Sequence, residues 1–197
     1  FGNKAITANV YPAFRIQGNA NVTVKNGNIT NNDYVFVLGA SDGSSAGDLT
    51  IKNGTFHGAT TVASVTKGNL VIEGGEFSVE PYQGSYAYLI NCKDEYYSTG
   101  DAKVSIKGGT FYKWNPENNA AEGAGTNFCV EGYIAVYDAA NETYTVQKGL
   151  IGKGTETEPF IIRNLRDLVF FRDHVNAGKT TYNAEGVHVA LGANIDM

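Results

Sequence analysis

The chain has 197 residues, of which 24 are glycine, 12% are aromatic and only 18% are charged. Such a composition is typical of turns and β-structure rather than of long helices. The net charge of −5 provides no basic surface, so we expect neither nucleic acid nor anionic membranes as partners. No apolar run approaches the roughly 18 residues of a membrane span, so we expect no membrane insertion by this segment.

A nine-residue phrase occurs four times in the first 111 residues. The copies are NVTVKNGNI (21–29), DLTIKNGTF (48–56), NLVIEGGEF (69–77) and KVSIKGGTF (103–111). Each alternates apolar and polar residues and then reaches Asn-Gly or Gly-Gly, which predicts a strand that ends in a turn. Aligning the copies on the glycine produces three apolar columns: Val22/Leu49/Leu70/Val104, Val24/Ile51/Ile72/Ile106 and Ile29/Phe56/Phe77/Phe111.

These columns predict the fold class. A lone strand cannot bury an apolar face, but parallel stacking of the copies buries it like against like. Apolar runs between the phrases, at 34–38, 61–65, 86–92 and 127–130, are each able to supply a second strand per repeat. We therefore predict an all-β chain, a right-handed parallel β-helix (solenoid) with a C-terminal strand-helix-strand segment. The alternative is an antiparallel sandwich with a hairpin at each Asn-Gly, although no phrase is followed by a mirror-image partner strand.

The two cysteines, Cys92 and Cys129, lie in comparable positions between phrases. They could sit one repeat apart and form a disulfide, or they could be two small buried side chains. Neither belongs to a CxxC motif or lies near a histidine in sequence, so we expect no metal site, no cofactor and no nucleophile here.

The chain changes character after the fourth phrase. Residues 114–147 begin with a loop rich in Asn, Ala and Gly and end in strand-like runs at 133–137 and 143–147. Further on, Asn164 is a plausible N-cap for a helix over 164–177, flanked by strand-like residues 159–162 and 187–191. We therefore predict a repeat domain over residues 1–149. Residues 150–197 would then be a strand-helix-strand segment, either a cap or the truncated start of a next module.

Several motifs support a family resemblance. The run Gly108-Gly109-Thr110-Phe111, the segment Glu131-Gly132-Tyr133 and the strand Tyr144-Thr145-Val146 resemble the ends of β-helix modules in large, mostly uncharacterised surface proteins of gut bacteria and their phages. The tail, including Ala193-Asn194-Ile195-Asp196-Met197, looks like the opening of a further β-rich module of such proteins. The resemblance implies a secreted or cell-surface bacterial protein of the pectin-lyase-like fold group and further domains in the same polypeptide. It implies no activity.

Catalysis of the kind found in pectin-lyase-like enzymes needs clustered carboxylates, either to hold calcium or to act as acid and base. Among the aligned polar columns the only carboxylates are Glu73 and Glu76, a pattern typical of a solvated sheet face. No histidine belongs to a serine or cysteine motif. We therefore expect no catalytic residues, while a polysaccharide lyase or glycoside hydrolase remains the alternative.

Aromatic residues in the later insertions favour a binding role. Aromatic rings stack on the apolar faces of sugars as well as on each other, so Tyr96, Tyr97, Tyr112 and Trp114 are the candidate glycan-binding residues. The competing interpretation is that these rings shield the open ends of the repeats. The sequence thus predicts a non-catalytic, extracellular scaffold or adhesin-like module whose possible partners are glycans or host and bacterial surface molecules.

Overall fold

The computed structural model describes residues 5–178 and 180–195. Phe1 to Lys4, Lys179, Asp196 and Met197 lie outside the described residues. The chain divides into two compact units, which we call unit 1 (residues 1–130 and 135–147) and unit 2 (residues 131–134 and 148–197).

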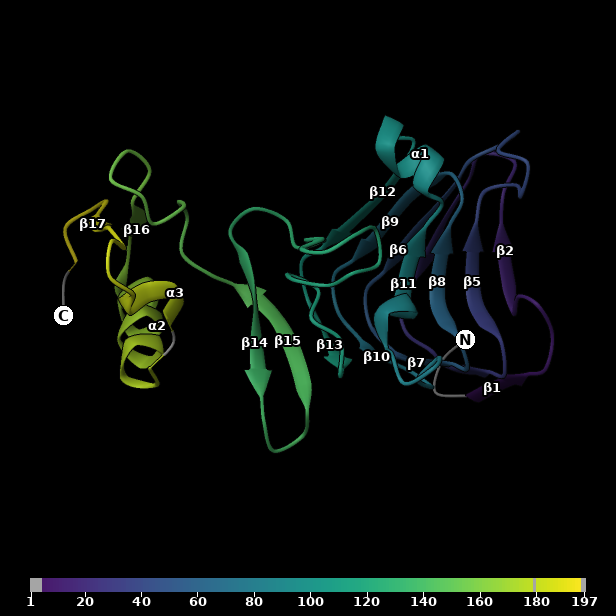
Figure 1. Ribbon diagram of the computed structural model, residues 1–197, viewed down its shortest axis with the longest axis horizontal. Helices are drawn as coiled ribbons and strands as arrows, with labels where there is room; N and C mark the ends of the chain where they lie inside the picture. The colour runs from purple at the N-terminus through teal and green to yellow at the C-terminus, as the bar shows by residue number, and fades with distance from the viewer. Residues whose placement is uncertain (1–4, 179, 196–197) are drawn as a thin grey trace. The chain divides into compact units, whose positions relative to one another are not determined.

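Unit 1 consists mainly of three sheets, and from β1 to β13 strands that follow one another in sequence belong to different sheets (Figure 1). In spatial order, sheet 1 contains β1 (Ala5–Ala8), β4 (Asn28–Asn31), β7 (Thr55–Gly58), β10 (Glu76–Val79), β13 (Gly109–Tyr112), β15 (Thr143–Lys148) and β14 (Tyr133–Asp138). Sheet 2 contains β11 (Ile90–Cys92), β8 (Thr61–Val65), β5 (Tyr34–Leu38) and β2 (Phe14–Ile16). Sheet 3 contains β12 (Ala102–Ile106), β9 (Gly68–Ile72), β6 (Gly47–Ile51) and β3 (Ala20–Val24).

The register within these sheets confirms the apolar columns. Ile51 pairs with Val24 on one side and with Ile72 on the other, and Ile72 pairs with Ile106. The phenylalanine column is also in register, and its rings stack face to face with centroids 5.4 Å apart for Phe56 and Phe77 and 4.9 Å apart for Phe77 and Phe111. The core of unit 1 lies along these columns.

The predicted fold class, a right-handed parallel β-helix, is wrong. The described strands form separate short parallel sheets rather than a closed solenoid, and sheet 1 becomes antiparallel where β15 pairs with β13. The physical reason lies inside the repeated phrase. In the second copy, Gly54 has a φ of +132°, so β6 ends at Ile51 in sheet 3 and β7 begins at Thr55 in sheet 1. What the structure shows is a chain made mostly of sheets, several of them parallel, with few helices.

The later insertions contain little strand. The run 86–92 was expected to be a strand, but a 3₁₀ turn, η1 (Ala87–Leu89), occupies its first part and only β11 follows. The run 127–130 contributes a single bridge, between Ile106 and Cys129. Helix α1 (Asp94–Thr99) connects β11 with β12 and ends at Gly100, whose left-handed conformation satisfies the last carbonyls.

Unit 2 has its own small sheet and hydrophobic cluster. It contains β16 (Phe160–Ile162), α2 (Leu165–Asn176), α3 (Thr180–Asn183) and β17 (Val189–Leu191), with β16 parallel to β17. The Asn164 side chain accepts the Asp167 N–H at 3.0 Å, which confirms the predicted N-cap. The predicted strand-helix-strand segment misses α3, whose Tyr182 is buried beside Leu150 and Ile162.

Candidate functional site

Trp114 lies in the core rather than in an exposed groove. Its side chain is only 3% exposed, and its ring contacts Phe111 and Phe128 with centroids 5.5 and 6.1 Å away. The indole Nε1 donates to the Ala87 carbonyl at 3.1 Å. Trp114 therefore closes the end of the phenylalanine stack, which is the shielding role that competed with glycan binding.

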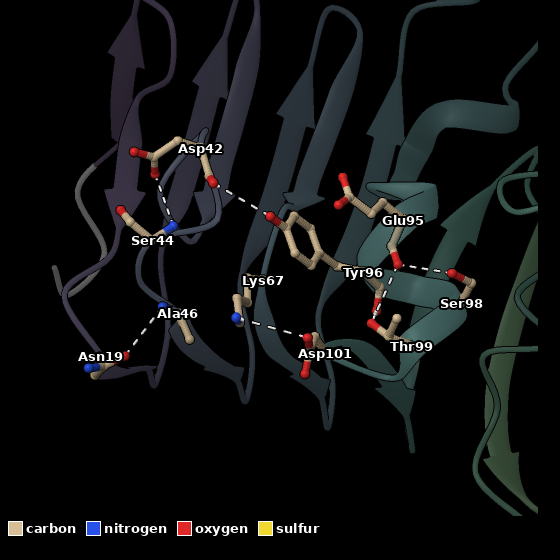
Figure 2. Close-up of polar contacts among 10 residues, drawn as sticks. All are labelled: Asn19, Asp42, Ser44, Ala46, Lys67, Glu95, Tyr96, Ser98, Thr99 and Asp101. Atoms are coloured by element: carbon tan, nitrogen blue, oxygen red, sulfur yellow. Dashed lines mark hydrogen bonds and ion pairs between the residues drawn. The ribbon is translucent and has the colours of Figure 1, made fainter.

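Tyr97 and Tyr96 lie on α1, and both are half-buried. The ring of Tyr97 packs edge-on against Phe128, and burial raises the pKa of its hydroxyl. Figure 2 shows the Tyr96 hydroxyl directed at the Asp42 carbonyl, 3.5 Å away. The Tyr96 ring also has the ammonium groups of Lys93 and Lys67 over it, at 4.9 and 5.5 Å from its centroid. Tyr96 thus joins α1 to the loop before β6.

Tyr112 lines a groove. It ends β13, and its ring meets Tyr86 edge-on at 6.0 Å while the Lys113 ammonium lies 5.1 Å from the ring centroid. Its hydroxyl points to a carboxylate oxygen of Glu142 at 3.5 Å. The four predicted rings therefore do not form a single surface.

The groove that Tyr112 lines, here called the central groove, has a volume of about 470 Å³. Its floor is the outer face of sheet 1, where Thr55, Glu76, Ser78, Thr110 and Tyr112 line it; Phe77, whose ring is buried in the core, also borders it. Strand β15 and the turn that connects it to β14 contribute Asp138, Asn141, Thr143 and Thr145.

Strand register explains why these polar side chains lie together. Glu76 pairs with Thr55 on one side and Thr110 on the other, and Thr110 pairs with Thr145. Because side chains alternate across a strand, Thr55, Glu76 and Thr110 each lie on the face opposite the buried phenylalanine that follows, and Thr145 lies opposite the buried Val146. The hydroxyls of Thr110 and Thr145 are 3.1 Å apart, and Thr55 donates to Glu76 at 3.4 Å.

The turn before β15 supplies a carboxylate and an amide at the groove's edge. Asp138 accepts the Asn141 side-chain amide at 2.7 Å and the Ala140 N–H at 3.0 Å. The hydrogen bond from Asn141, followed by the backbone bonds, holds the pKa of Asp138 below its ordinary value. Asp138 is therefore a carboxylate at neutral pH and is poorly suited to donate a proton.

A second hollow, the corner groove, lies where the repeated phrases turn from sheet 3 into sheet 1. It has a volume of about 350 Å³ and is lined by Asn26, Gly27, Asn28, Asn53, Gly54, Thr55 and Glu76. Thr55 and Glu76 also line the central groove, so the two hollows adjoin along sheet 1.

The structure brings together one hydroxyl–imidazole–carboxylate chain that the sequence pattern did not indicate. His57 on β7 places Nδ1 2.9 Å from the Ser78 hydroxyl on β10 and Nε2 3.4 Å from a Glu80 oxygen. Such a chain can activate a serine. Here, however, the Glu80 side chain is 66% exposed, and Ser78 lies within a regular strand instead of the sharp turn that presents a nucleophile. We assign this chain the role of joining neighbouring strands.

The cysteines are both free, and burial raises the pKa of each thiol. The thiolate is the nucleophilic form of cysteine, and a raised pKa keeps the group protonated, so a buried thiol is a poor nucleophile. Cys92 ends β11 in sheet 2, whereas Cys129 bridges to Ile106 in sheet 3. Within residues 5–178 and 180–195, no group of three or more His, Cys, Asp or Glu side chains is arranged to hold a metal ion.

Sequence reasoning missed most of the central groove. The aligned column Asn28/Thr55/Glu76/Thr110 was visible, and we interpreted its carboxylate as part of a solvated face. The column could have been recognised as the floor of a hollow only with the hairpin of β14 and β15 in place, since that hairpin builds the groove's wall.

Comparisons with protein-family models, curated proteins and solved structures gave no match. In the part of the chain that the structure describes, no helix combines the length and apolar character needed to span a bilayer.

Proposed function

We propose that this protein binds a saccharide in the central groove and acts as a non-catalytic binding and scaffolding module outside the cell. The observation that carries the proposal is the half-buried Tyr112 ring in a groove that is also lined by hydroxyls, carboxylates, an amide and Phe77. An aromatic face beside convergent polar groups is the usual composition of a sugar site, because a sugar has both apolar C–H faces and hydroxyl edges.

The orientation of Tyr112 is fixed before any ligand arrives. Tyr86 supports the ring from one side, Lys113 lies over it, and Glu142 accepts its hydroxyl. The Lys113 ammonium is itself paired with Glu142 at 3.1 Å, which strengthens this arrangement. A ring held in this way loses little conformational freedom on binding, which favours affinity.

The polar lining supports recognition of hydroxyl groups. The carboxylates of Glu76 and Asp138 accept hydrogen bonds, and the threonine hydroxyls of β13 and β15 both donate and accept. The pKa of Asp138 is held below its ordinary value, so this carboxyl group offers an acceptor for sugar hydroxyls rather than a general acid.

The test is binding of the intact protein to a glycan array, followed by calorimetry with each saccharide that binds. Tyr112→Ala should weaken binding about fivefold to tenfold, because stacking on one ring is worth on the order of 1 kcal/mol. Tyr82→Ala is the matched control, since Tyr82 is 52% exposed and lies outside both grooves.

Two results would contradict the proposal. One is no binding to any glycan on the array, and the other is binding that Tyr112→Ala leaves unchanged. An assay for new reducing ends or unsaturated products, run on each saccharide that binds, tests the alternative of a hydrolase or lyase. Turnover by the intact protein that Tyr112→Ala abolishes would show that the protein is an enzyme rather than a binding module.

The extracellular location is the part of the proposal that rests on family resemblance. The matching motifs, such as Gly108-Gly109-Thr110-Phe111, are those of secreted or surface-displayed proteins. Protease treatment of intact producing cells tests it, because a surface protein is cleaved while cytoplasmic markers survive.

A further inference from the structure

We propose that the central and corner grooves together bind one extended, uncharged saccharide chain lying across the strands of sheet 1, and that they discriminate against uronic acid polymers. This inference rests on the proposed saccharide binding and adds the length, direction and charge of the ligand.

The continuity of the two grooves sets the direction of the chain. One in-register row of outward side chains runs through both, from Asn28 on β4 through Thr55 and Glu76 to Thr110 and Thr145. The row crosses five neighbouring strands, which at a spacing of about 4.8 Å span about 19 Å. That length accommodates an oligosaccharide rather than a single sugar.

The two ends of the path offer different contacts. At the corner end, the side-chain amides of Asn26, Asn28 and Asn53 both donate and accept hydrogen bonds. At the other end, Tyr112 offers a ring face and Asp138 offers a carboxylate. A ligand that touches both ends must therefore present hydroxyl groups along its whole length and an apolar sugar face near Tyr112.

The charge along the path determines which saccharides fit. Glu76 lies in the middle, where both grooves share it, and Asp138 lies at the hairpin edge. The residues that line the two grooves include no lysine or arginine. Lys113, which holds the Tyr112 ring, is already paired with Glu142. A carboxylate on each sugar would meet like charge with no cation to offset it, so uronates are disfavoured.

The test uses the full chain and matched pairs of linear hexasaccharides. Each pair contains a neutral sugar and its uronate: glucose with glucuronate, mannose with mannuronate, and galactose with galacturonate. For any pair that binds, calorimetry at low salt should show that the protein binds the neutral member at least about tenfold more tightly than its uronate, and the measurement is repeated at high salt. Because Glu76 and Asp138 are exposed to solvent, the difference should shrink as salt screens the charges.

Two variants locate the effect. Glu76→Gln retains an oxygen that can accept a hydrogen bond from Thr55 but removes the charge. It should therefore reduce the ratio of the affinity for a neutral saccharide to the affinity for its uronate. Asn53→Ala removes an amide at the corner end, so it should weaken a hexasaccharide several-fold and leave a disaccharide that stacks on Tyr112 unaffected.

The outcomes separate this inference from the proposed function. Uronates bound as tightly as their neutral partners, in a manner that Tyr112→Ala abolishes, would overturn the charge selection and leave saccharide binding intact. Equal affinity for disaccharides and hexasaccharides would overturn the extended path. Absence of binding by every pair, together with an empty glycan array, would overturn the proposed function and this inference with it.

Discussion

At the residue scale, the clearest distinction is between the two faces of a strand. Ile72 is 1% exposed and pairs with Ile51 and Ile106, whereas Thr50 lies on the opposite face and is half-exposed. The same alternation places Phe77 in the core and Glu76 in both grooves. The core and the polar lining of the grooves are therefore formed by alternate residues of the same strands.

Ile72→Asp should prevent unit 1 from folding. An unpaired charge buried between two isoleucines costs several kcal/mol, a large share of the roughly 5–15 kcal/mol that stabilises a typical domain. Thr50→Asp is the control and should unfold within a few degrees of the native chain. Thermal unfolding followed by circular dichroism measures both, and equal losses would show that the buried face has been misassigned.

Glu122 is an acidic residue whose surroundings favour its protonated form. Its Oε1 accepts the Cys92 N–H at 2.5 Å, while its Oε2 is buried with no hydrogen-bond partner among the described residues. Burial is the largest cause of a pKa raised above the ordinary value of 4.5, and the nearby Asp94 raises it further. Tyr97 and the Cys92 thiol are the other titratable groups that interact with it.

We expect Glu122→Gln to change the pH dependence of stability. Because the folded state favours protonated Glu122, this contribution is fully present below pH 4.5 and is lost as pH rises through the raised pKa. The variant keeps an acceptor for Cys92 and cannot ionise. The two proteins should have similar melting temperatures at pH 4, and the variant should melt at a higher temperature at pH 7.5. The corresponding gain in the free energy of unfolding should be less than about 1 kcal/mol, because solvent screens the site. A variant that is less stable at pH 7.5 would contradict this.

At the element scale, the glycines Gly54, Gly75 and Gly109 of the last three phrases have a positive φ where the chain passes from sheet 3 into sheet 1. Gly54 has a φ of +132°, and a Cβ there would overlap the Gly27 carbonyl and the Phe56 ring. Gly84 has a φ of +80° with open space around it. Comparing alanine substitutions at Gly54 and Gly84 therefore distinguishes the cost of backbone strain from the cost of steric overlap.

Gly54→Ala should destabilise unit 1 by more than the backbone conformation alone explains. Strain at positive φ costs about 1–2 kcal/mol, and the overlap with Gly27 and Phe56 adds to it. Gly84→Ala carries only the strain. Urea unfolding compares them, and equal losses would mean that the turn at Gly54 relaxes without cost.

The sequence predicts some elements well and others poorly, for physical reasons. The columns through Ile51 and Phe56 follow from period-two alternation, and the helix at Asn164 follows from its cap, because both signals are local. The division of the phrase into two sheets does not follow, since a positive-φ glycine between strands looks the same in sequence as one that ends a hairpin. Trp114 was expected to be exposed because it lies with other aromatic residues in a later insertion, although its ring packs against Phe111 and Phe128 in the core.

At the scale of the whole molecule, each unit has its own core. The apolar side chains of α2, among them Leu168 and Phe171, pack in unit 2 against Leu150, Ile162 and Tyr182. The columns of unit 1 are filled by its own strands. The helix therefore has its hydrophobic partners within its own unit.

A chain that ends after Gly149 should keep unit 1 folded and monomeric. The truncation removes α2 together with Leu150 and Ile162, and of the residues packed in this cluster only Ile134 stays in the shortened chain. We expect the melting temperature of unit 1 to fall by no more than about 4 °C, which corresponds to about 1 kcal/mol. Size-exclusion chromatography and thermal unfolding test this, and aggregation of the shortened chain would show that residues 150–197 cap unit 1.

The position of Trp114 makes these experiments easier to interpret. It is the single tryptophan of the sequence, and it is buried at the end of the phenylalanine stack in unit 1. Its intrinsic fluorescence is therefore an optical signal from one unit alone, which shifts to the red when water reaches the indole. Circular dichroism at the helical wavelengths responds mostly to unit 2, because its α2 has 12 residues whereas α1 in unit 1 has six. Recording both signals in one melt resolves the two units spectroscopically, with no label attached to either.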